Sequence, residues 1–162
     1  MWEDIIDINI DTGDIQIIEA DGDDVVRFKN KDNQVTESYT YGEKGSFSKD
    51  FDLQKGNLKV KTIDGTIKRK YNVLSTTNID KANDLFNRIA DASNIEFEKL
   101  IYNKGGHRVA DIATTGDEST TYYGVTFADN HVKNGFIVES WDHNHPGGTP
   151  PATARILSCG KG

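Results

Sequence analysis

The chain has 162 residues, enough for one domain or for one domain with a small extension. Apolar residues make up 35% of it, the formal net charge is −7, and no apolar run is long enough to span a membrane. Non-specific binding of nucleic acid requires clustered lysine and arginine, which the acidic excess argues against. Neither a nucleic acid nor a membrane is therefore expected as a partner.

The first ten residues, MWEDIIDINI, carry acids where a signal peptide needs a basic start and an apolar middle. The chain is therefore expected either not to use that export route or to be cut from a longer protein, and its localisation stays open. The single cysteine, Cys159, excludes an internal disulfide and a cysteine-based zinc knuckle.

Residues 1–75 read as short strands separated by turns. Apolar and polar residues alternate in IIDINI (5–10) and in DIQII (14–18), which is the period of a β-strand. Asp7 and Asp11 alternate with isoleucines, so these acids are expected on the solvent face of the first strand.

A β-hairpin is predicted most clearly near the end of this region. LKVKTI (58–63) and TIKRKY (66–71) both alternate, and the Asp-Gly pair at 64–65 between them favours a tight hairpin turn. The segment before residue 75 is therefore expected to be rich in hairpins.

The pattern changes near residue 75 from strands to a helix. Residues 75–94 carry apolar side chains at helical spacing, with Thr77 or Asn78 as the N-cap and Ser-Asn at 93–94 as the end. The apolar stripe is expected to pack in the core and consists of Ile79, Ala82, Leu85, Phe86, Ile89 and Ala90.

Strands are expected again after the helix. They are IEFEKLIY (95–102), HRVADIATT (107–115), TYYGVTF (121–127) and a final strand at 136–143. The segment after Pro151 is expected to be a short helix or a loop.

Two of the four histidines stand two residues apart in WDHNHPGG, at the end of the last expected strand. Side chains at i and i+2 of a strand share a face, so His143 and His145 are a candidate pair of zinc ligands. Glu96, flanked by apolar residues, is the candidate general base, because burial would raise the pKa of its carboxyl. The alternative is that the histidines are solvated in a turn and that Glu96 is a solvated strand residue like Glu98.

These residues resemble the JAMM (Jab/MPN) metallopeptidases, which carry a glutamate on a strand after a helix and later His-x-His-Pro and Ser-x-x-Asp. NIEFEKL supplies the glutamate and WDHNHPGG the histidines, and Glu96 and His143 are 47 residues apart. The layout is most similar to the JAB-like toxin domains at the C-termini of Rhs-type and other polymorphic bacterial toxins. The resemblance covers residues 76–162. For residues 1–75 it rests only on the presence of a strand-rich segment before the helix.

The resemblance implies an α+β fold: a mixed sheet flanked by helix, with a JAMM and cytidine-deaminase-like core in residues 76–162, preceded by the hairpin-rich segment 1–75. It implies a zinc metallopeptidase that cleaves a peptide or isopeptide bond. His143 and His145 would bind Zn²⁺, and Glu96 would activate the attacking water. A toxin module of this kind implies an immunity protein as partner and export as part of a larger toxin.

The sequence departs from the family pattern at the third zinc ligand. In the simplest form of the family this ligand is an aspartate eleven residues after the second histidine, and that position is Ile156. No acid follows Asp142, and the third residue after Ser158 is Lys161. The sequence is therefore expected either to be cut before the last ligand or to have a degenerate site. The hydroxyl groups that are candidates for stabilising the oxyanion are those of Thr149, Thr153 and Ser158.

Two other functions compete with the zinc peptidase. An inactive fragment that serves as a binding or structural module would explain the missing aspartate. A small metal nuclease is suggested by the likeness of DHNHP to an HNH motif. The net charge of −7, the lack of a basic patch and the absence of a histidine after His145 count against the nuclease.

Overall fold

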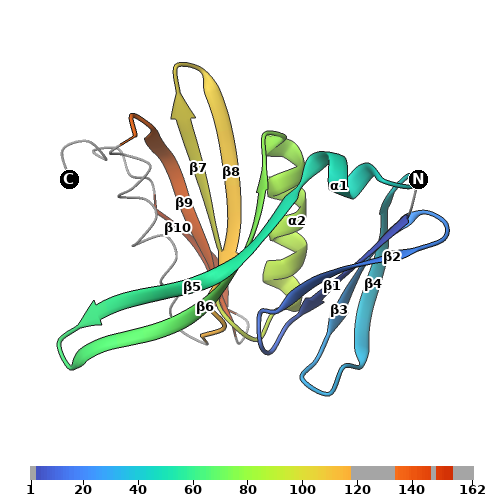
Figure 1. Ribbon diagram of the computed structural model, residues 1–162, viewed down its shortest axis with the longest axis horizontal. Coiled ribbons are helices and arrows are strands. Elements are labelled where there is room, and N and C mark those ends of the chain that lie inside the picture. Colours follow the sequence, from blue (N-terminus) through green and yellow to red (C-terminus); the bar gives the residue numbers. More distant parts are fainter. Residues whose placement is uncertain (1–2, 118–133, 147–148, 155–162) are drawn as a thin grey trace.

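The computed structural model describes residues 3–117, 134–146 and 149–154, and it is mostly β-structure with few helices (Figure 1). A four-stranded N-terminal sheet has the order β2-β1-β3-β4. Its strands are β1 (Glu3–Asn9), β2 (Ile15–Ala20), β3 (Asp24–Lys29) and β4 (Val35–Gly42).

A six-stranded sheet has the order β10-β9-β7-β8-β6-β5. Its strands are β5 (Asp52–Thr62), β6 (Gly65–Thr76), β7 (Glu98–Lys104), β8 (His107–Thr114), β9 (Ile137–His145) and β10 (Thr149–Ala154). The helices are α1 (Ser46–Asp50) and α2 (Ile79–Ala92). In the described part of the chain, β1 and β3 pair in parallel and the other strand pairs are antiparallel. The N-terminal sheet is therefore mixed, and the described pairs of the larger sheet are antiparallel.

Helix α2 lies between the two sheets and packs its apolar stripe into the main core (Figure 1). The Asn78 side chain accepts a hydrogen bond from the Lys81 backbone N–H at 3.1 Å, which confirms one of the two predicted N-caps. The core joins the inner face of the N-terminal sheet, both helices and one face of the larger sheet. A helix therefore flanks the larger sheet as predicted, with the N-terminal sheet on its other side, but the described pairs of the larger sheet are antiparallel where mixed pairing was predicted.

The β5–β6 hairpin forms as predicted but is longer, and its turn lies one residue earlier. Thr62 pairs with Gly65, so the turn residues are Ile63 and Asp64. Gly65 adopts a φ of +126°, a conformation that residues with a side chain rarely take. Local pattern thus predicted the hairpin, and glycine geometry decided where it turns.

Two short elements differ from the predictions. Helix α1 follows the turn at 42–45 and was not predicted, because it spans little more than one turn and has a single buried residue, Phe47. Directly after Pro151 the chain continues as strand β10 to Ala154 instead of forming a helix or loop, because it pairs with β9, and the rest of the predicted segment lies outside the described residues.

The change of pattern near residue 75 falls within the larger sheet. Strands β5 and β6 precede it, yet β6 pairs with β8 through residues 72–76. The division into 1–75 and 76–162 stays a prediction, and the sheet of the second region draws two of its strands from the first.

Asp7 was expected to be exposed to solvent on the first strand, and that expectation is wrong. The outer face of β1 does carry it, but its side chain is only 7% exposed because Arg27 and Lys29 cover it. Arg27 Nε and Nη2 donate to the two carboxylate oxygens at 2.7 and 2.8 Å, and Lys29 Nζ lies 3.0 Å away. Burial acts to raise the pKa of Asp7, but these cationic donors outweigh it and hold the pKa below its ordinary value.

Replacing Asp7 by asparagine is expected to lower the free energy of unfolding by about 2 kcal/mol at neutral pH, because the two cations lose a buried anionic partner. The folded-state pKa of Asp7 lies below 3.8, so its stabilisation is complete above pH 3.8 and is lost as the pH falls through that lower value. Urea unfolding at several pH values should show the wild type and the variant converging only at acidic pH. A difference that does not change with pH would contradict this assignment.

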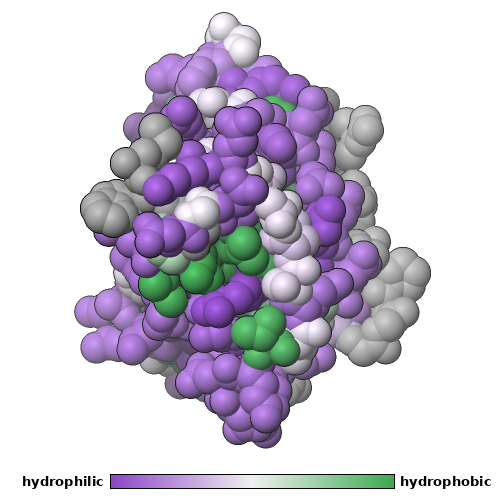
Figure 2. All heavy atoms as spheres, turned by 90° about the vertical axis from the view of Figure 1, so that its right-hand side faces the viewer, coloured by the Kyte–Doolittle hydropathy of each residue, from purple (hydrophilic) through white to green (hydrophobic). Residues whose placement is uncertain are grey.

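The outer face of the N-terminal sheet also carries a small apolar patch. Register places Ile5 beside Ile18 and Val25, and Ile18 is 41% exposed. On the side of the molecule seen in Figure 2, apolar side chains occupy a limited area within a hydrophilic surface. A patch of this size is common on protein surfaces and by itself indicates no partner. Among the described residues, no helix is long and apolar enough to cross a membrane.

Candidate functional site

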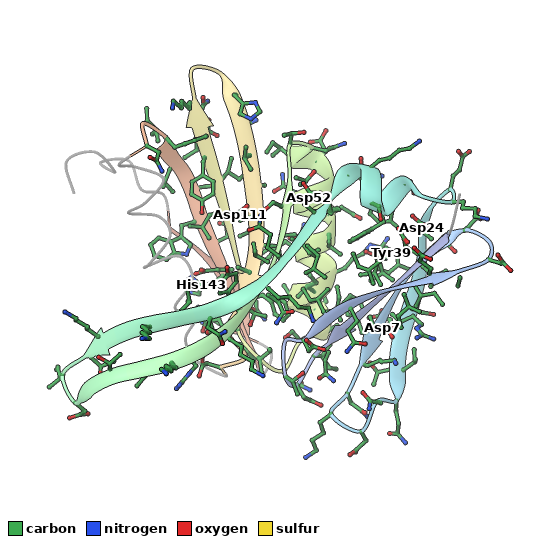
Figure 3. The ribbon with its side chains drawn as sticks, viewed as in Figure 1. Asp7, Asp24, Tyr39, Asp52, Asp111 and His143 are labelled. Atoms are coloured by element: carbon green, nitrogen blue, oxygen red, sulfur yellow. The ribbon has the colours of Figure 1, made fainter. Side chains whose placement is uncertain are left out.

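Strand β9 holds both candidate histidines. It extends two residues further than predicted, so His143 and His145 lie on the strand, on one face. Their imidazole rings are nearly parallel, with centroids 5.0 Å apart and an interplanar angle of 11°. Trp141 shares this face and packs with the second apolar cluster, on the side of the sheet away from α2, and Figure 3 labels His143 on this strand.

Glu96 lies just before β7, not on a strand as predicted. The segment between α2 and β7 is irregular as far as Phe97, and pairing with β9 begins at Glu98, which lies opposite His143. A backbone hydrogen bond from Asn144 N–H to the Phe97 carbonyl, at 3.3 Å, extends the alignment toward Glu96. The chain therefore brings the predicted glutamate to the predicted histidines across two neighbouring segments.

The Glu96 carboxyl is partly buried and interacts electrostatically with both imidazoles. Burial raises the pKa of Glu96 above its ordinary value, and the nearby His143 and His145 oppose that rise. A carboxylate with a raised pKa is a stronger base than a solvated one. The half-buried Glu96 carboxylate, which lies near two imidazoles, is thus suited to accepting a proton.

The backbone of Glu96 is fixed on both sides. Its N–H donates to the Asp117 carbonyl at 2.9 Å, and its carbonyl accepts from Thr114 Oγ1 at 2.7 Å. A residue outside a sheet gains its position from such bonds, because no regular ladder holds it. Glu96 is therefore held in place although it lies in an irregular segment.

Asn144, the residue between the histidines, is the main link between β9 and the Glu96 segment. Its place between the two histidines on β9 points it to the opposite face from them, and it is 1% exposed. Its Oδ1 accepts from Phe97 N–H at 2.6 Å, and its Nδ2 donates to the Ile95 carbonyl at 3.1 Å. The two bonds bracket Glu96, so this side chain sets the distance between the base and the histidines.

Glu98 was expected to be solvated, and that expectation is wrong. It is 1% exposed, it lies opposite His143 in the register, and its Oε2 accepts from Trp141 Nε1 at 2.8 Å. A sheet that pairs antiparallel places such partners on one face with their Cβ atoms about 5 Å apart. The sequence contained a sign that Glu98 shares a face with Glu96, because they are two residues apart. The same spacing had placed His143 and His145 on one face.

The α2-facing side of these strands is occupied by an ion pair. Asp142 lies 3.4 Å from Lys99 Nζ, and Lys99 also donates to Asn83 on α2. Asp142 therefore points away from the histidine face, in agreement with its opposite position along the strand.

The remaining predicted residues are placed only in part. Ser158 lies outside the described residues, as does Cys159. Thr149 and Thr153 belong to β10, where Thr149 is opposite His145. His107 begins β8 and is exposed.

The donors at the site fit a zinc ion in their chemistry but not in number. Two imidazoles on one face supply two nitrogen ligands, and a carboxylate stands beside them. Within the ranges that the structure describes, no group of three or more His, Cys, Asp and Glu side chains is arranged to hold a metal. A zinc ion at this position would thus be held by His143 and His145, with water or a further ligand completing its shell.

The chain matches one family model, described as JAB-like toxin 1, over residues 74–158. The match covers more than half of the chain and includes Glu96, His143 and His145. No curated protein and no solved structure matches the chain.

Proposed function

The chain belongs to the JAB-like toxin 1 family, and on this premise we propose that it is a JAMM-type zinc hydrolase that cleaves a peptide or isopeptide bond. The observation that carries the proposal is the pairing that brings the segment of Glu96 beside His143 and His145 on β9, from a distant part of the sequence. A glutamate and two histidines on one side of a sheet supply the general base and two of the three protein ligands of a catalytic zinc site.

In this proposal each residue has a separate role. His143 and His145 would hold zinc through imidazole nitrogens, and zinc when bound would polarise water and the substrate carbonyl. Glu96 would accept a proton from the attacking water on a carboxylate oxygen as the C–O bond forms. It would then give that proton to the departing amine nitrogen as the C–N bond breaks, which leaves an acid and an amine.

Several features of the chain support these roles. Partial burial strengthens Glu96 as a base, and the hydrogen bonds of Asn144 and Thr114 keep the segment around it in place. Glu98, which lies opposite His143 in the register, accepts a hydrogen bond from Trp141 on the face of the sheet that carries the histidines. A toxin domain would also require an immunity protein to neutralise it, a partner that belongs to the proposal.

Zinc binding tests the proposal before any substrate is known. Titration of the metal-free chain with zinc by calorimetry is expected to show one equivalent bound. His143→Ala and His145→Ala are each expected to weaken binding by about 100-fold or more, since each removes a ligand. His107→Ala is the matched control, because His107 is exposed at the start of β8, and it should bind zinc as the wild type does.

A wild-type chain that binds no zinc at equimolar supply would sink the enzyme proposal. The same holds if both histidine variants bind zinc as tightly as the wild type. In either case the catalytically inactive binding module would become the better account of this chain.

A further inference from the structure

The β5–β6 hairpin is strongly basic although the chain as a whole is acidic. Asp64 is the only acidic residue between residues 53 and 73 of the sequence, whereas the net charge of the whole chain is −7. The basic residues in this segment are Lys55, Lys59, Lys61, Lys68, Arg69 and Lys70. The expectation that the chain lacks a basic patch is therefore wrong for this part of the fold.

Five of these residues share one face of the hairpin. Lys59 lies directly opposite Lys68, and Lys70 lies opposite Asn57. Cross-strand partners and residues two apart along a strand point to the same side. This surface is called the lysine face and consists of Lys55, Lys59, Lys61, Lys68 and Lys70, all of them exposed.

The lysine face begins where the hairpin leaves the cover of α2. Leu53 and Leu74 lie opposite one another on the same side of the sheet and pack against the main core. Beyond them β6 pairs with β8 only from Asn72 onward in the described part of the chain, and the rest of the hairpin projects as a two-stranded ribbon (Figure 1). One side of the ribbon thus changes from apolar to lysine where it extends past the helix.

The lysines are largely unneutralised. Lys55 forms an ion pair with Asp14 at 2.7 Å. Lys59, Lys61, Lys68 and Lys70 form no ion pair with any carboxylate among the residues that the structure describes. Like charges directly opposite in a sheet are destabilising, so the arrangement carries a cost that an anionic partner would relieve.

Lysines on exposed strands also discourage unwanted strand pairing. That protection does not require five lysines on one face, and it does not require Lys59 and Lys68 to stand opposite one another. At the base of the ribbon, Lys55, Asn57 and Lys70 help to line a hollow of about 370 Å³, which gives room for side chains of a partner. The pattern therefore favours recognition over protection alone.

We propose that the lysine face and the neighbouring edge of β5 bind an extended acidic segment of a partner protein, with Asp or Glu at alternate positions. Strand β5 is the outermost strand of the larger sheet in the described chain, so its edge can pair with an added strand. Lys59 and Lys61 repeat at about 6.7 Å along β5, the spacing of alternate side chains in an extended peptide. Acids at that spacing would lie beside successive lysines.

A nucleic acid fits this surface less well. The other positions on the lysine face are Asn57, Thr66 and Asn72, so this face carries no aromatic ring on which a base could stack. Tyr71 also lines the hollow, but it packs against the second apolar cluster on the opposite side of the ribbon. The surface is also independent of the proposed active site, because the histidines lie on the opposite face of the sheet, away from α2.

The test uses labelled peptides of about twelve residues with the full chain, measured by fluorescence anisotropy at ionic strengths from about 0.01 to 0.15 M. One peptide alternates Glu and Thr, a second has the same composition in Glu-Glu-Thr-Thr blocks, and a single-stranded oligonucleotide of equal charge is the third probe. We expect the alternating peptide to bind most tightly and its affinity to fall as salt rises.

Two double variants locate the binding surface. Lys59→Gln with Lys61→Gln is expected to weaken binding of the alternating peptide by about fivefold to tenfold, since two exposed ion pairs are lost. Lys31→Gln with Lys49→Gln removes the same charge at exposed positions elsewhere and should leave the affinity near that of the wild type. Circular dichroism of each variant checks that its fold is unchanged.

Backbone pairing is tested with two N-methylated forms of the alternating peptide, one at every Glu and one at every Thr. In an extended peptide the N–H groups of all the Glu residues point to one edge and those of all the Thr residues to the other. Only one of the two methylated forms therefore blocks the edge that faces β5, and that form should lose binding. The proposal is overturned if the block peptide binds as tightly as the alternating one, if both methylated forms bind like the unmodified peptide, or if the two double variants weaken binding equally. Tighter binding of the oligonucleotide would also overturn it and assign the surface to nucleic acid.

Discussion

Replacing Glu96 by glutamine is expected to lower the rate of peptide or isopeptide hydrolysis by about 10²- to 10⁴-fold, while zinc binding stays unchanged. Glutamine keeps the size of the side chain but cannot accept the proton of the attacking water. Hydrolysis can be followed with the zinc-loaded chain and a library of internally quenched peptides that includes lysine isopeptide bonds. Calorimetry on the same samples measures zinc binding separately.

Glu139→Gln provides a matched control for this experiment. It makes the same chemical change on β9, at a carboxylate whose oxygens accept hydrogen bonds from Asn103 and Arg108. We expect it to leave hydrolysis within about twofold of the wild type. Wild-type activity that survives in Glu96→Gln would remove Glu96 from the mechanism, and a zinc-loaded wild type that cleaves nothing in the library would contradict the proposed function.

Replacing Asn144 by alanine is expected to lower the free energy of unfolding by about 3 kcal/mol. The change leaves the buried Phe97 N–H without its acceptor and takes a donor from the Ile95 carbonyl. Hydrolysis should also fall although all three predicted site residues are intact, because the segment that positions Glu96 loses its link to β9. Urea unfolding with an unchanged m-value is the measurement.

Asn57→Ala is the matched control for the loss of stability. Asn57 lies on β5 and is exposed, so its replacement should change the free energy of unfolding by less than about 0.5 kcal/mol. If Asn144→Ala is as stable as this control, Asn144 does not link the two segments in the way its hydrogen bonds indicate.

The local pattern of the sequence was sufficient for several elements. Alternation predicted β1, β2 and the β5–β6 hairpin, and helical spacing with a cap at Asn78 predicted α2. These features depend on neighbours close in sequence, which is why a single chain reveals them. The short helix α1 escaped because one buried residue, Phe47, is too little for a periodic pattern.

The candidate site was predicted in its composition but not in its construction. The spacing of His143 and His145 and the flanks of Glu96 pointed to all three residues, and the match to the JAB-like toxin 1 family covers them. Their roles in zinc binding and catalysis stay predictions. The sequence could not tell that Glu96 stands outside the strand, because strand ends depend on which residues of β9 are available to pair.

What the sequence determined by itself is thus the set of local elements and the side chains able to do chemistry. The tertiary structure decided which distant groups meet, because long-range pairing brings together residues with no local relation. The β7–β9 register buried Glu98 opposite His143 and gave Asn144 its two partners. The β5–β6 register placed five lysines on one face, which turned basic residues scattered along an acidic chain into a single surface.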